Sequence, residues 1–333
     1  MKIIVTGGAG FIGSNLLLWL HEKYPESQFL NIDKLSYASD LHYLDAVKSS
    51  NRYTFKKLDI VDRNAVRDVI QNYRPDGVFH LAAESHVDNS ITGPEPFIRS
   101  NILGTFNLLE ECRRFWQENN TFTQNRFLHV STDEVYGSLG DEGAFTEKTP
   151  YAPNSPYSAS KAGSDFIVRS YFHTYGMNVV TTNCSNNFGP HQHDEKLIPT
   201  VIRTALNHES IPVYGKGQNV RDWLYVEDHC AALDLVFQKG RSGETYNIGG
   251  ENEWKNIDLV KEICNILNEE VEDAPASDFK SLITFVTDRP GHDFRYAIDA
   301  DKIKNELGWQ RKESFQERLA ETVNWYIKRY QST

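Results

Sequence analysis

The sequence lacks any long apolar run. No stretch approaches the roughly 20 apolar residues that a membrane-spanning helix needs, and the apolar start at residues 3–5 is interrupted by Gly7 and Gly8. That start is also too short for the apolar region of a signal peptide. We therefore expect a cytoplasmic protein with no membrane partner.

Cysteine and positive charge are also scarce. The four cysteines form neither a C-x-x-C motif nor the regular spacing of a disulfide framework, which favours a reducing compartment. The 35 Lys and Arg residues are outnumbered by 46 Asp and Glu residues, which gives a net charge of −11. Because such a chain repels nucleic acid and no basic cluster offsets the charge, we expect a small-molecule partner and no nucleic acid.

The first half of the chain alternates short β-rich runs with longer helical stretches, which is the pattern of βαβ units on a parallel sheet. The predicted strands are Lys2–Thr6, Phe29–Asp33, Tyr53–Leu58, Val78–Ala82, Arg126–Ser131 and Val179–Cys184. A helix is predicted over Phe97–Trp116, where apolar residues recur at three- and four-residue steps. We predict an α/β fold with a Rossmann-like, doubly wound parallel sheet.

After residue 190 the pattern changes to shorter elements and more turns. The predicted elements are a helix over Leu197–His208, strands over Ile211–Tyr214 and Trp223–Val226, an element near Tyr246–Ile248, and a helix over Ile257–Asn268. We assign residues 1–190 to a first domain and residues 191–333 to a smaller C-terminal lobe. Some elements around residues 220–260 are expected to return to the first domain.

A glycine-rich turn follows the first predicted strand. Gly8, Gly10 and Gly13 form a G-x-G-x-x-G motif that is followed by an apolar helix. Glycines at these positions allow a tight turn and a close approach of the backbone to a pyrophosphate, which the N–H groups of the helix start can bind. The alternative is a tight turn that binds nothing, but the strand and helix around it favour a dinucleotide site.

Asp33 ends the second predicted strand, twenty residues after Gly13. A carboxylate at this position can hydrogen-bond the hydroxyls of the adenosine ribose, and it repels the 2′-phosphate of NADP. Asp59 and Ile60, at the end of the third strand, are placed to meet the adenine. We therefore predict that residues 1–190 form an NAD-binding Rossmann domain, although the charge of Lys34 opposes that choice of cofactor.

Tyr157 and Lys161 lie four residues apart in a helical run over residues 157–175, so they share one helix face. A nearby ammonium stabilises a phenolate and lowers its pKa, which enables a tyrosine to act as a base. Such a pair also occurs by chance on a helix surface. After a dinucleotide fold, however, it is the favoured catalytic pair.

The fifth predicted strand ends in Thr132, Asp133 and Glu134. Ligands of open parallel sheets bind outside the carboxyl ends of the strands, so these side chains should face the site. Two adjacent carboxyl groups suit an elimination, which needs one acid and one base. A solvated Asp-Glu turn is an equally good interpretation of these residues alone.

Taken together, these residues resemble the extended short-chain dehydrogenase/reductase family over nearly the whole chain. The matching segments are residues 6–13, 81–88, 131–137, 157–161, 186–190, 221–223 and 288–293. Within the family, the chain is most similar to the dTDP-glucose 4,6-dehydratases. Thr-Asp-Glu at 132–134 and Arg-Pro-Gly-His-Asp at 289–293 are the most specific segments.

The resemblance implies a reaction on a nucleotide sugar that yields a 4-keto-6-deoxy sugar. Tyr157 would take the proton of the 4-hydroxyl while NAD accepts hydride from C4, with Lys161 lowering the tyrosine pKa and Thr132 bonded to O4. Glu134 would then remove the C5 proton while a protonated Asp133 delivers a proton to the departing 6-hydroxyl. Hydride returns to C6, so there is no net redox change.

The resemblance also implies the binding residues and a homodimer formed through the helices at 97–116 and 157–175. The residues expected to hold NAD are Gly7, Gly10, Phe11, Ile12, Gly13, Asp33, Lys34, Ser36, Asp59, Ile60, Leu81, Ala82, Ala83, Ser100, Tyr157, Lys161 and Asn187. The residues expected to bind the substrate, largely in the smaller lobe, are Ser85, Thr132, Asn186, Lys196, Leu197, Pro212, Tyr214, Arg221, Asn256, Arg289, His292 and Tyr296. Arg221 suits a diphosphate because its planar fork can pair two oxygens, whereas a salt-bridged surface arginine is the alternative.

Three other functions fit parts of the sequence. A UDP-sugar 4-epimerase or a UDP-glucuronate decarboxylase would share the cofactor site and the Tyr157–Lys161 pair, but would not need Asp133 and Glu134. A non-catalytic NAD-binding regulator would not need the tyrosine and lysine. A metal site in the polar segment 191–195 is not expected, because its histidines and acids lack helical spacing and a partner set elsewhere.

Overall fold

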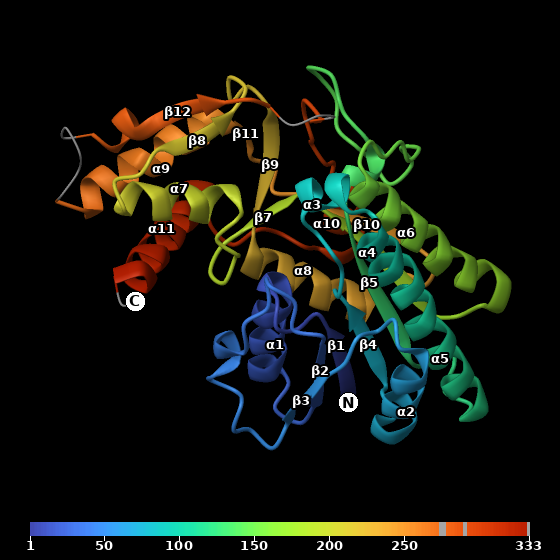
Figure 1. Ribbon diagram of the computed structural model, residues 1–333. Helices are drawn as coiled ribbons and strands as arrows, with labels where there is room; N and C mark the ends of the chain where they lie inside the picture. The colour runs from blue at the N-terminus through green and yellow to red at the C-terminus, as the bar shows by residue number, and fades with distance from the viewer. Residues whose placement is uncertain (273–277, 289–291, 332–333) are drawn as a thin grey trace.

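Seven parallel strands form the central sheet of the computed structural model, which describes residues 1–333 except 273–277, 289–291 and 332–333 (Figure 1). Their order across the sheet is β10-β6-β5-β4-β1-β2-β3. The strands are β1 (Lys2–Thr6), β2 (Gln28–Asp33), β3 (Tyr53–Lys57), β4 (Gly77–His80), β5 (Arg126–Thr132), β6 (Val179–Cys184) and β10 (Thr245–Ile248). This order reverses direction at β1 and β4, where the ligand crevice of a doubly wound sheet lies.

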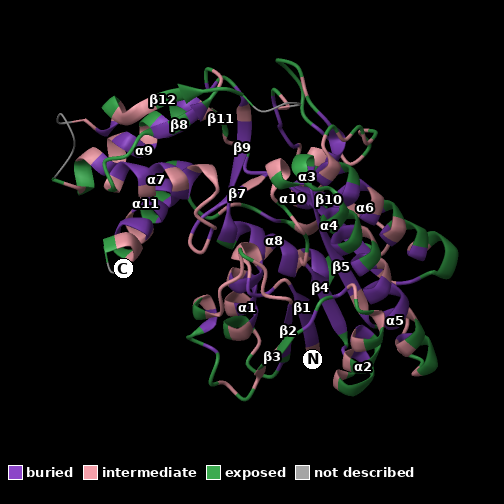
Figure 2. Cartoon of the chain, in the orientation of Figure 1, coloured by how far each residue is buried: buried purple, intermediate pink, exposed green. Residues whose placement is uncertain are grey.

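Helices cover both faces of this sheet, so its strands are buried on both sides (Figure 2). One face packs against α1 (Phe11–Lys23), α8 (Val226–Lys239) and α10 (Asp301–Leu307), and the other against α2 (Arg63–Tyr73), α5 (Thr105–Glu118) and α6 (Pro156–Tyr175). Alternate residues of a strand serve the two faces. On β1, Ile3 and Val5 join the first core and Ile4 joins the second.

A smaller lobe lies to one side of the sheet and has a hydrophobic core of its own (Figure 1). Its helices are α7 (Leu197–Leu206), α9 (Asn256–Glu270) and α11 (Phe315–Gln331), which pack on one another. Its sheets are β11-β9-β7 (Glu253–Lys255, Val220–Tyr225 and Asn186–Phe188) and the pair β12-β8 (Ile283–Val286 and Ile211–Tyr214). Between the lobe's elements, α8 and β10 return to the large sheet, where β10 pairs with β6.

The six strands predicted for the first half are all present, each within two residues of its predicted bounds. The strand predicted over Trp223–Val226 is misplaced, because β9 covers Val220–Tyr225 and Val226 already begins α8. The helix predicted over Phe97–Trp116 is a composite of α4 (Glu95–Phe97), a π-helical segment η2 (Ile98–Gly104) and α5. The remaining short helices are α3 (Val87–Thr92), η1 (Leu41–Leu44), η3 (Asp133–Tyr136) and η5 (Phe279–Leu282).

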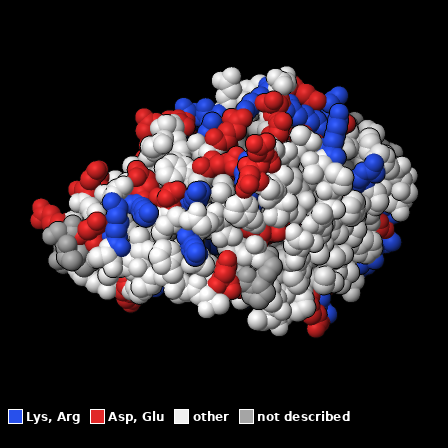
Figure 3. All heavy atoms as spheres, turned by 90° about the horizontal axis from the view of Figure 1, so that it is seen from above, with Lys and Arg blue, Asp and Glu red and all other residues white. Residues whose placement is uncertain are grey.

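None of the described helices is long and apolar enough to cross a membrane. Acidic and basic side chains share the face of the molecule shown in Figure 3, and acidic groups gather over its centre.

The Trp116 side chain anchors α5 to the sheet. It is 0% exposed and its indole N–H donates to the carbonyl of Pro75 at 2.9 Å. We predict that Trp116→Ala lowers the free energy of unfolding by roughly 3–5 kcal/mol, because it leaves a large cavity and removes the indole hydrogen bond to the Pro75 carbonyl. Urea unfolding followed by circular dichroism would measure it. Phe285→Ala is the control, since that ring is 61% exposed, and an equal loss in both variants would contradict the argument.

Candidate active site

The glycine turn between β1 and α1 lies against the segment that follows β4. Gly7 has φ +71°, and a Cβ atom on it would lie 2.8 Å from the backbone of Ala82. A Cβ atom on Gly13 would lie 2.1 Å from the Gly7 carbonyl oxygen. The N-cap residue of the thirteen-residue helix α1 is Gly10, which has no side chain to cap the helix. The first N–H groups of α1 are therefore directed at the turn. The local geometry therefore needs glycine and presents a site for an anionic group.

The Asp33 carboxylate joins this turn to the end of β2. It accepts hydrogen bonds from the N–H groups of Ala9 at 3.0 Å and Leu35 at 2.8 Å, and from the Ser39 hydroxyl at 3.1 Å. The side chain is 6% exposed and still lines the cavity. Asp33 thus shapes the turn as well as adding a negative charge to its edge.

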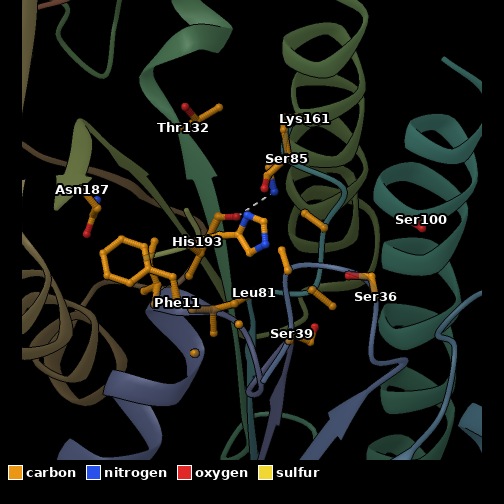
Figure 4. A pocket seen from close by; sticks show the side chains of 18 of the residues that line it. Phe11, Ser36, Ser39, Leu81, Ser85, Ser100, Thr132, Lys161, Asn187 and His193 are labelled. Carbon is orange, nitrogen blue, oxygen red and sulfur yellow. Dashed lines mark hydrogen bonds between the residues drawn. The ribbon is translucent and has the colours of Figure 1, made fainter. Parts of the chain in front are cut away.

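One cavity extends from the glycine turn to the ends of β5 and β6 (Figure 4). In this view Phe11 lies on one side of it and Ser36 on the other, and Thr132 and Lys161 lie towards its upper end. All the residues predicted to hold the cofactor line this cavity: Gly7, Gly10, Phe11, Ile12, Gly13, Asp33, Lys34, Ser36, Asp59, Ile60, Leu81, Ala82, Ala83, Ser100, Tyr157, Lys161 and Asn187. The predicted catalytic residues line it as well: Thr132, Asp133, Glu134, Tyr157 and Lys161.

The start of α6 fixes where Tyr157 stands. Ser155 caps this helix in a capping box with Ser158, with both hydrogen bonds at 3.0 Å, and Pro156 occupies the first helical position. Tyr157 follows directly and is 8% exposed. Burial raises the pKa of the phenol well above its ordinary value, and the Glu134 charge adds to this. Without a ligand, the phenol therefore stays protonated.

Lys161 stands one turn further along α6 and is 5% exposed. Its ammonium donates to the carbonyl of Val130 on β5 at 2.8 Å. Burial lowers the lysine pKa, and the charge of Asp165 on the next turn opposes that effect. Burial is the largest influence on the pKa of the phenol in the ligand-free protein, and the expectation that Lys161 lowers this pKa stays a prediction.

The short helix η3 begins directly after β5 and places the two acids. Asp133 is 2% exposed, and its Oδ2 atom is buried with no hydrogen-bond partner in the described part of the chain. Burial raises its pKa well above the ordinary value, followed by the repulsion of Glu134 and then of Asp222. Glu134 is only half-buried. The pair therefore combines a carboxyl group biased towards its protonated form with one closer to solvent.

A buried polar network beneath Lys161 was missed by the sequence analysis. The Asp165 carboxylate accepts from His129 Nε2 at 3.0 Å, from the Ser131 hydroxyl at 2.8 Å and from the Tyr151 hydroxyl at 3.0 Å. Burial raises the pKa of Asp165 to about 7, with Lys161 acting against it. The only sequence signal was the position of Asp165 four residues after Lys161, which puts both on one helix face.

The residues predicted to bind the substrate fall into two groups. Ser85, Thr132, Asn186 and Lys196 line the cavity, whereas Leu197, Pro212, Tyr214, Arg221, Asn256, His292 and Tyr296 lie outside its lining. Arg289 lies outside the described residues. Arg221 is buried, donates to the backbone carbonyls of Val220, Asp293 and Phe294, and lies 4.3 Å from the centre of the Tyr296 ring. Arg221 is therefore a buried arginine and not a surface one.

The segment 191–195 closes one side of the cavity. Glu195 accepts a hydrogen bond from the Tyr37 hydroxyl at 3.1 Å and lies 3.6 Å from both His86 and His193. The last helix holds the segment from behind, because the Tyr326 hydroxyl donates to the Gln192 carbonyl at 2.6 Å. Among the described residues, no group of three or more His, Cys, Asp or Glu side chains is arranged to hold a metal.

A glycine turn after β1, an acid at the end of β2 and a Tyr–Lys pair on α6 meet in one cavity. This combination defines the class of dinucleotide-dependent enzymes built on a doubly wound sheet.

Comparisons with known proteins narrow this class. A family model described as GDP-mannose 4,6 dehydratase matches residues 4–322. A dTDP-glucose 4,6-dehydratase of Salmonella typhimurium is 52% identical over 338 residues, which cover 98% of this chain and 93% of that protein. The chain therefore belongs to this dehydratase family of extended short-chain dehydrogenases and reductases, which confirms the resemblance seen in the sequence.

Solved structures agree with this family. A dTDP-glucose 4,6-dehydratase of Bacillus anthracis, in complex with NAD, has a TM-score of 0.89 and 44% identity, covering 99% of this chain and 98% of that one. One from Streptomyces venezuelae, with NAD and dTDP bound, has a TM-score of 0.90 and 42% identity, covering 100% of this chain and 98% of that one.

The raised pKa of Asp133 gives a testable dependence of stability on pH. A carboxyl group whose pKa is higher in the folded state holds its proton more tightly there, so its cost to stability is absent below the unfolded pKa and grows as pH rises. We predict that Asp133→Asn, which mimics the protonated acid, stabilises the protein more at about pH 8 than at about pH 4.5. Urea unfolding at both pH values would measure the difference, with exposed Asp141→Asn as the control. A gain that is equal at both pH values would contradict burial of the charge.

Proposed function

We propose that this protein converts dTDP-glucose to dTDP-4-keto-6-deoxyglucose, using NAD and releasing one molecule of water. The observation that carries the proposal is the placement of a buried Asp133 oxygen, which has no hydrogen-bond partner among the described residues, beside Glu134 in the same cavity as Tyr157 and Lys161. An elimination needs a proton donor and a base close together. A 4-epimerase shares the tyrosine and lysine but has no use for the two acids.

NAD fits the residues of the cavity. Any Cβ atom on Gly7 or Gly13 would collide with neighbouring backbone, so the turn is kept open for a close approach to a pyrophosphate. Asp33 faces the same cavity as an acceptor for ribose hydroxyls. When bound, NAD supplies the redox chemistry, oxidising the sugar at C4 and later reducing it at C6, and its positive oxidised ring favours the phenolate form of Tyr157.

Residues on α6 and at the end of β5 carry out the first proton transfer. Tyr157 accepts the proton of the 4-hydroxyl while the C4–O bond becomes a carbonyl, and Thr132 hydrogen-bonds that oxygen. Lys161 holds its position through the Val130 carbonyl at 2.8 Å and keeps a positive charge beside the phenol. Because the pair is buried, the charges interact more strongly than they would in water.

The elimination falls to the two acids. The 4-ketone acidifies the C5 proton, which the Glu134 carboxylate takes. The C6–O bond breaks, a C5–C6 double bond forms, and Asp133 gives its proton to the leaving hydroxyl, which departs as water. After Glu134 has exchanged its proton with solvent and C6 has been reduced, Glu134 delivers a proton to C5. The sugar thus loses one water without net oxidation.

The nucleotide diphosphate is proposed to extend from the cavity towards the smaller lobe. Lys196 and Asn186 line the cavity on that side, and Arg221 carries a buried positive charge near the start of β9. We also place Tyr296, His292 and Asn256 there, the last because its Oδ1 atom is buried without a partner in the described residues. Thymidine as the base is supported by the substrate of the relatives at 52% identity.

The direct test is turnover in heavy water. We predict that the protein converts dTDP-glucose to a 4-keto-6-deoxy product that has lost water and carries one solvent deuterium at C5, as measured by mass spectrometry and NMR. UDP-, GDP- and CDP-glucose are the comparison substrates. Formation of the 4-epimer without loss of water would favour the epimerase instead.

The two acids can be tested separately from the redox pair. We predict that Asp133→Asn and Glu134→Gln each lower the rate of water loss by roughly 100-fold or more, because each removes one proton transfer. Oxidation at C4, seen as reduced dinucleotide on the protein, should persist in both. Glu142→Gln in the exposed loop is the charge-matched control. Near wild-type elimination in both variants would refute the assignment.

We also propose a homodimer that works in the cytoplasm. Four large apolar side chains lie exposed on or beside η2 and α6: Ile98, Leu103, Phe166 and Tyr175, at 47%, 41%, 58% and 46%. A second copy would cover them. We predict that Phe166→Asp shifts the sedimentation coefficient from dimer to monomer, whereas Phe285→Asp on β12 leaves it unchanged. A monomeric wild-type protein would contradict this proposal.

The four cysteines are free and buried, which fits a reducing compartment such as the cytoplasm.

A further inference from the structure

Lys34 lines the end of the cavity where the glycine turn and Asp33 lie, and its charge bears on the choice between NAD and NADP. NADP differs from NAD by a phosphate on the adenosine ribose, and a lysine beside that ribose would attract the phosphate. Of the cavity-lining residues between Ile32 and Ile60, all of which the structure describes, Lys34 carries a positive charge while Asp33 and Asp59 carry negative charges. The binding of the extra phosphate of NADP therefore depends on whether the Lys34 charge is available to offset the repulsion by Asp33 and Asp59.

The Lys34 ammonium is already engaged. It donates to the Glu84 carboxylate at 2.5 Å and to the Ser100 hydroxyl at 3.2 Å. The two side chains of the ion pair are 34% and 17% exposed, so they are partly screened from water. Glu84 comes from the segment after β4, a strand that only β1 separates from β2 in the sheet.

The backbone of Glu84 is hydrogen-bonded on both sides to the Asn101 side chain. Its backbone N–H donates to the Asn101 side-chain oxygen at 2.8 Å, and the Asn101 amide donates back to the Glu84 carbonyl at 3.0 Å. The same amide group donates to the Ser160 hydroxyl on α6 at 2.8 Å, and Asn101 is 1% exposed. Ser100 and Asn101 are neighbours in the π-helical segment η2, and such segments occur at functional sites. The ion pair is therefore supported on both sides by fixed groups.

We propose that Glu84 is a specificity-determining residue that favours NAD over NADP by neutralising Lys34. With Glu84 ionised, the negative charges of Asp33 and Asp59 act on an incoming phosphate without a free counter-charge. This proposal rests on the proposed function, because it assumes that the cavity holds a nicotinamide dinucleotide. It assigns a role to a residue that does not itself line the cavity.

The test measures which dinucleotide the purified protein holds. The wild type and the Glu84→Gln, Lys34→Met and double variants would be incubated with equal excesses of NAD and NADP until the bound fraction is constant. The protein is then separated by rapid gel filtration and the bound dinucleotides are quantified by chromatography. We predict that Glu84→Gln raises the bound ratio of NADP to NAD by roughly fivefold, because it frees one partly screened positive charge.

The other variants separate the mechanism from a general change of charge. In the Lys34→Met background, Glu84→Gln should change the ratio by less than about twofold, since no ammonium is left to release. Exposed Glu118→Gln removes the same charge far from the cavity and should leave the ratio unchanged. An unchanged ratio in Glu84→Gln, or an equal rise in both backgrounds, overturns the proposal. A wild type that retains neither dinucleotide refutes the proposed function itself.

Discussion

The register between the ends of β1, β4 and β5 is the constraint on which the cavity depends. Thr6 pairs with His80, and His80 pairs with His129, so three chain segments leave the sheet at one edge. The Thr6 hydroxyl donates to His80 Nδ1 at 2.7 Å and accepts from the Ala82 N–H at 3.2 Å, which holds the glycine turn against the segment after β4. A one-residue slip would move every side chain of the slipped strand to the other face of the sheet and separate the two halves of the site.

Burial of charge is the second theme of the structure. Asp133, Lys161 and Asp165 are each at most 5% exposed, and each is less stable as an ion there than in water. The protein offsets part of this cost with hydrogen bonds to Lys161 and Asp165, but one Asp133 oxygen has no hydrogen bond within the described part of the chain. Local departures from good packing and pairing of this kind are expected where chemistry, rather than stability, sets the choice of residue.

The sequence predicted the large sheet well because its strands are separated by clear turns and helices. The prediction of element boundaries was less accurate where elements follow one another without a break. At Tyr225 and Val226, for example, a strand is followed directly by a helix. The cofactor turn, Asp33 and the Tyr157–Lys161 pair carry local spacing that can be recognised. Asp165 with His129 carries none, because these partners are 36 residues apart and meet only through the packing of α6 on β5. The π-helical geometry of η2 likewise left no mark on the apolar periodicity.

The contacts of the last helix have a consequence for how the site is completed. Tyr326 and Tyr330 on α11 hold the Gln192 carbonyl and the Asp194 side chain, and Gln192 lines the cavity. The glycine turn, by contrast, belongs to the first strand and helix of the chain. During synthesis on the ribosome, the large sheet can therefore begin to assemble long before the wall formed by residues 191–195 gains its support. A nascent chain would have a recognisable dinucleotide cleft that stays open on one side until its final helix emerges and docks.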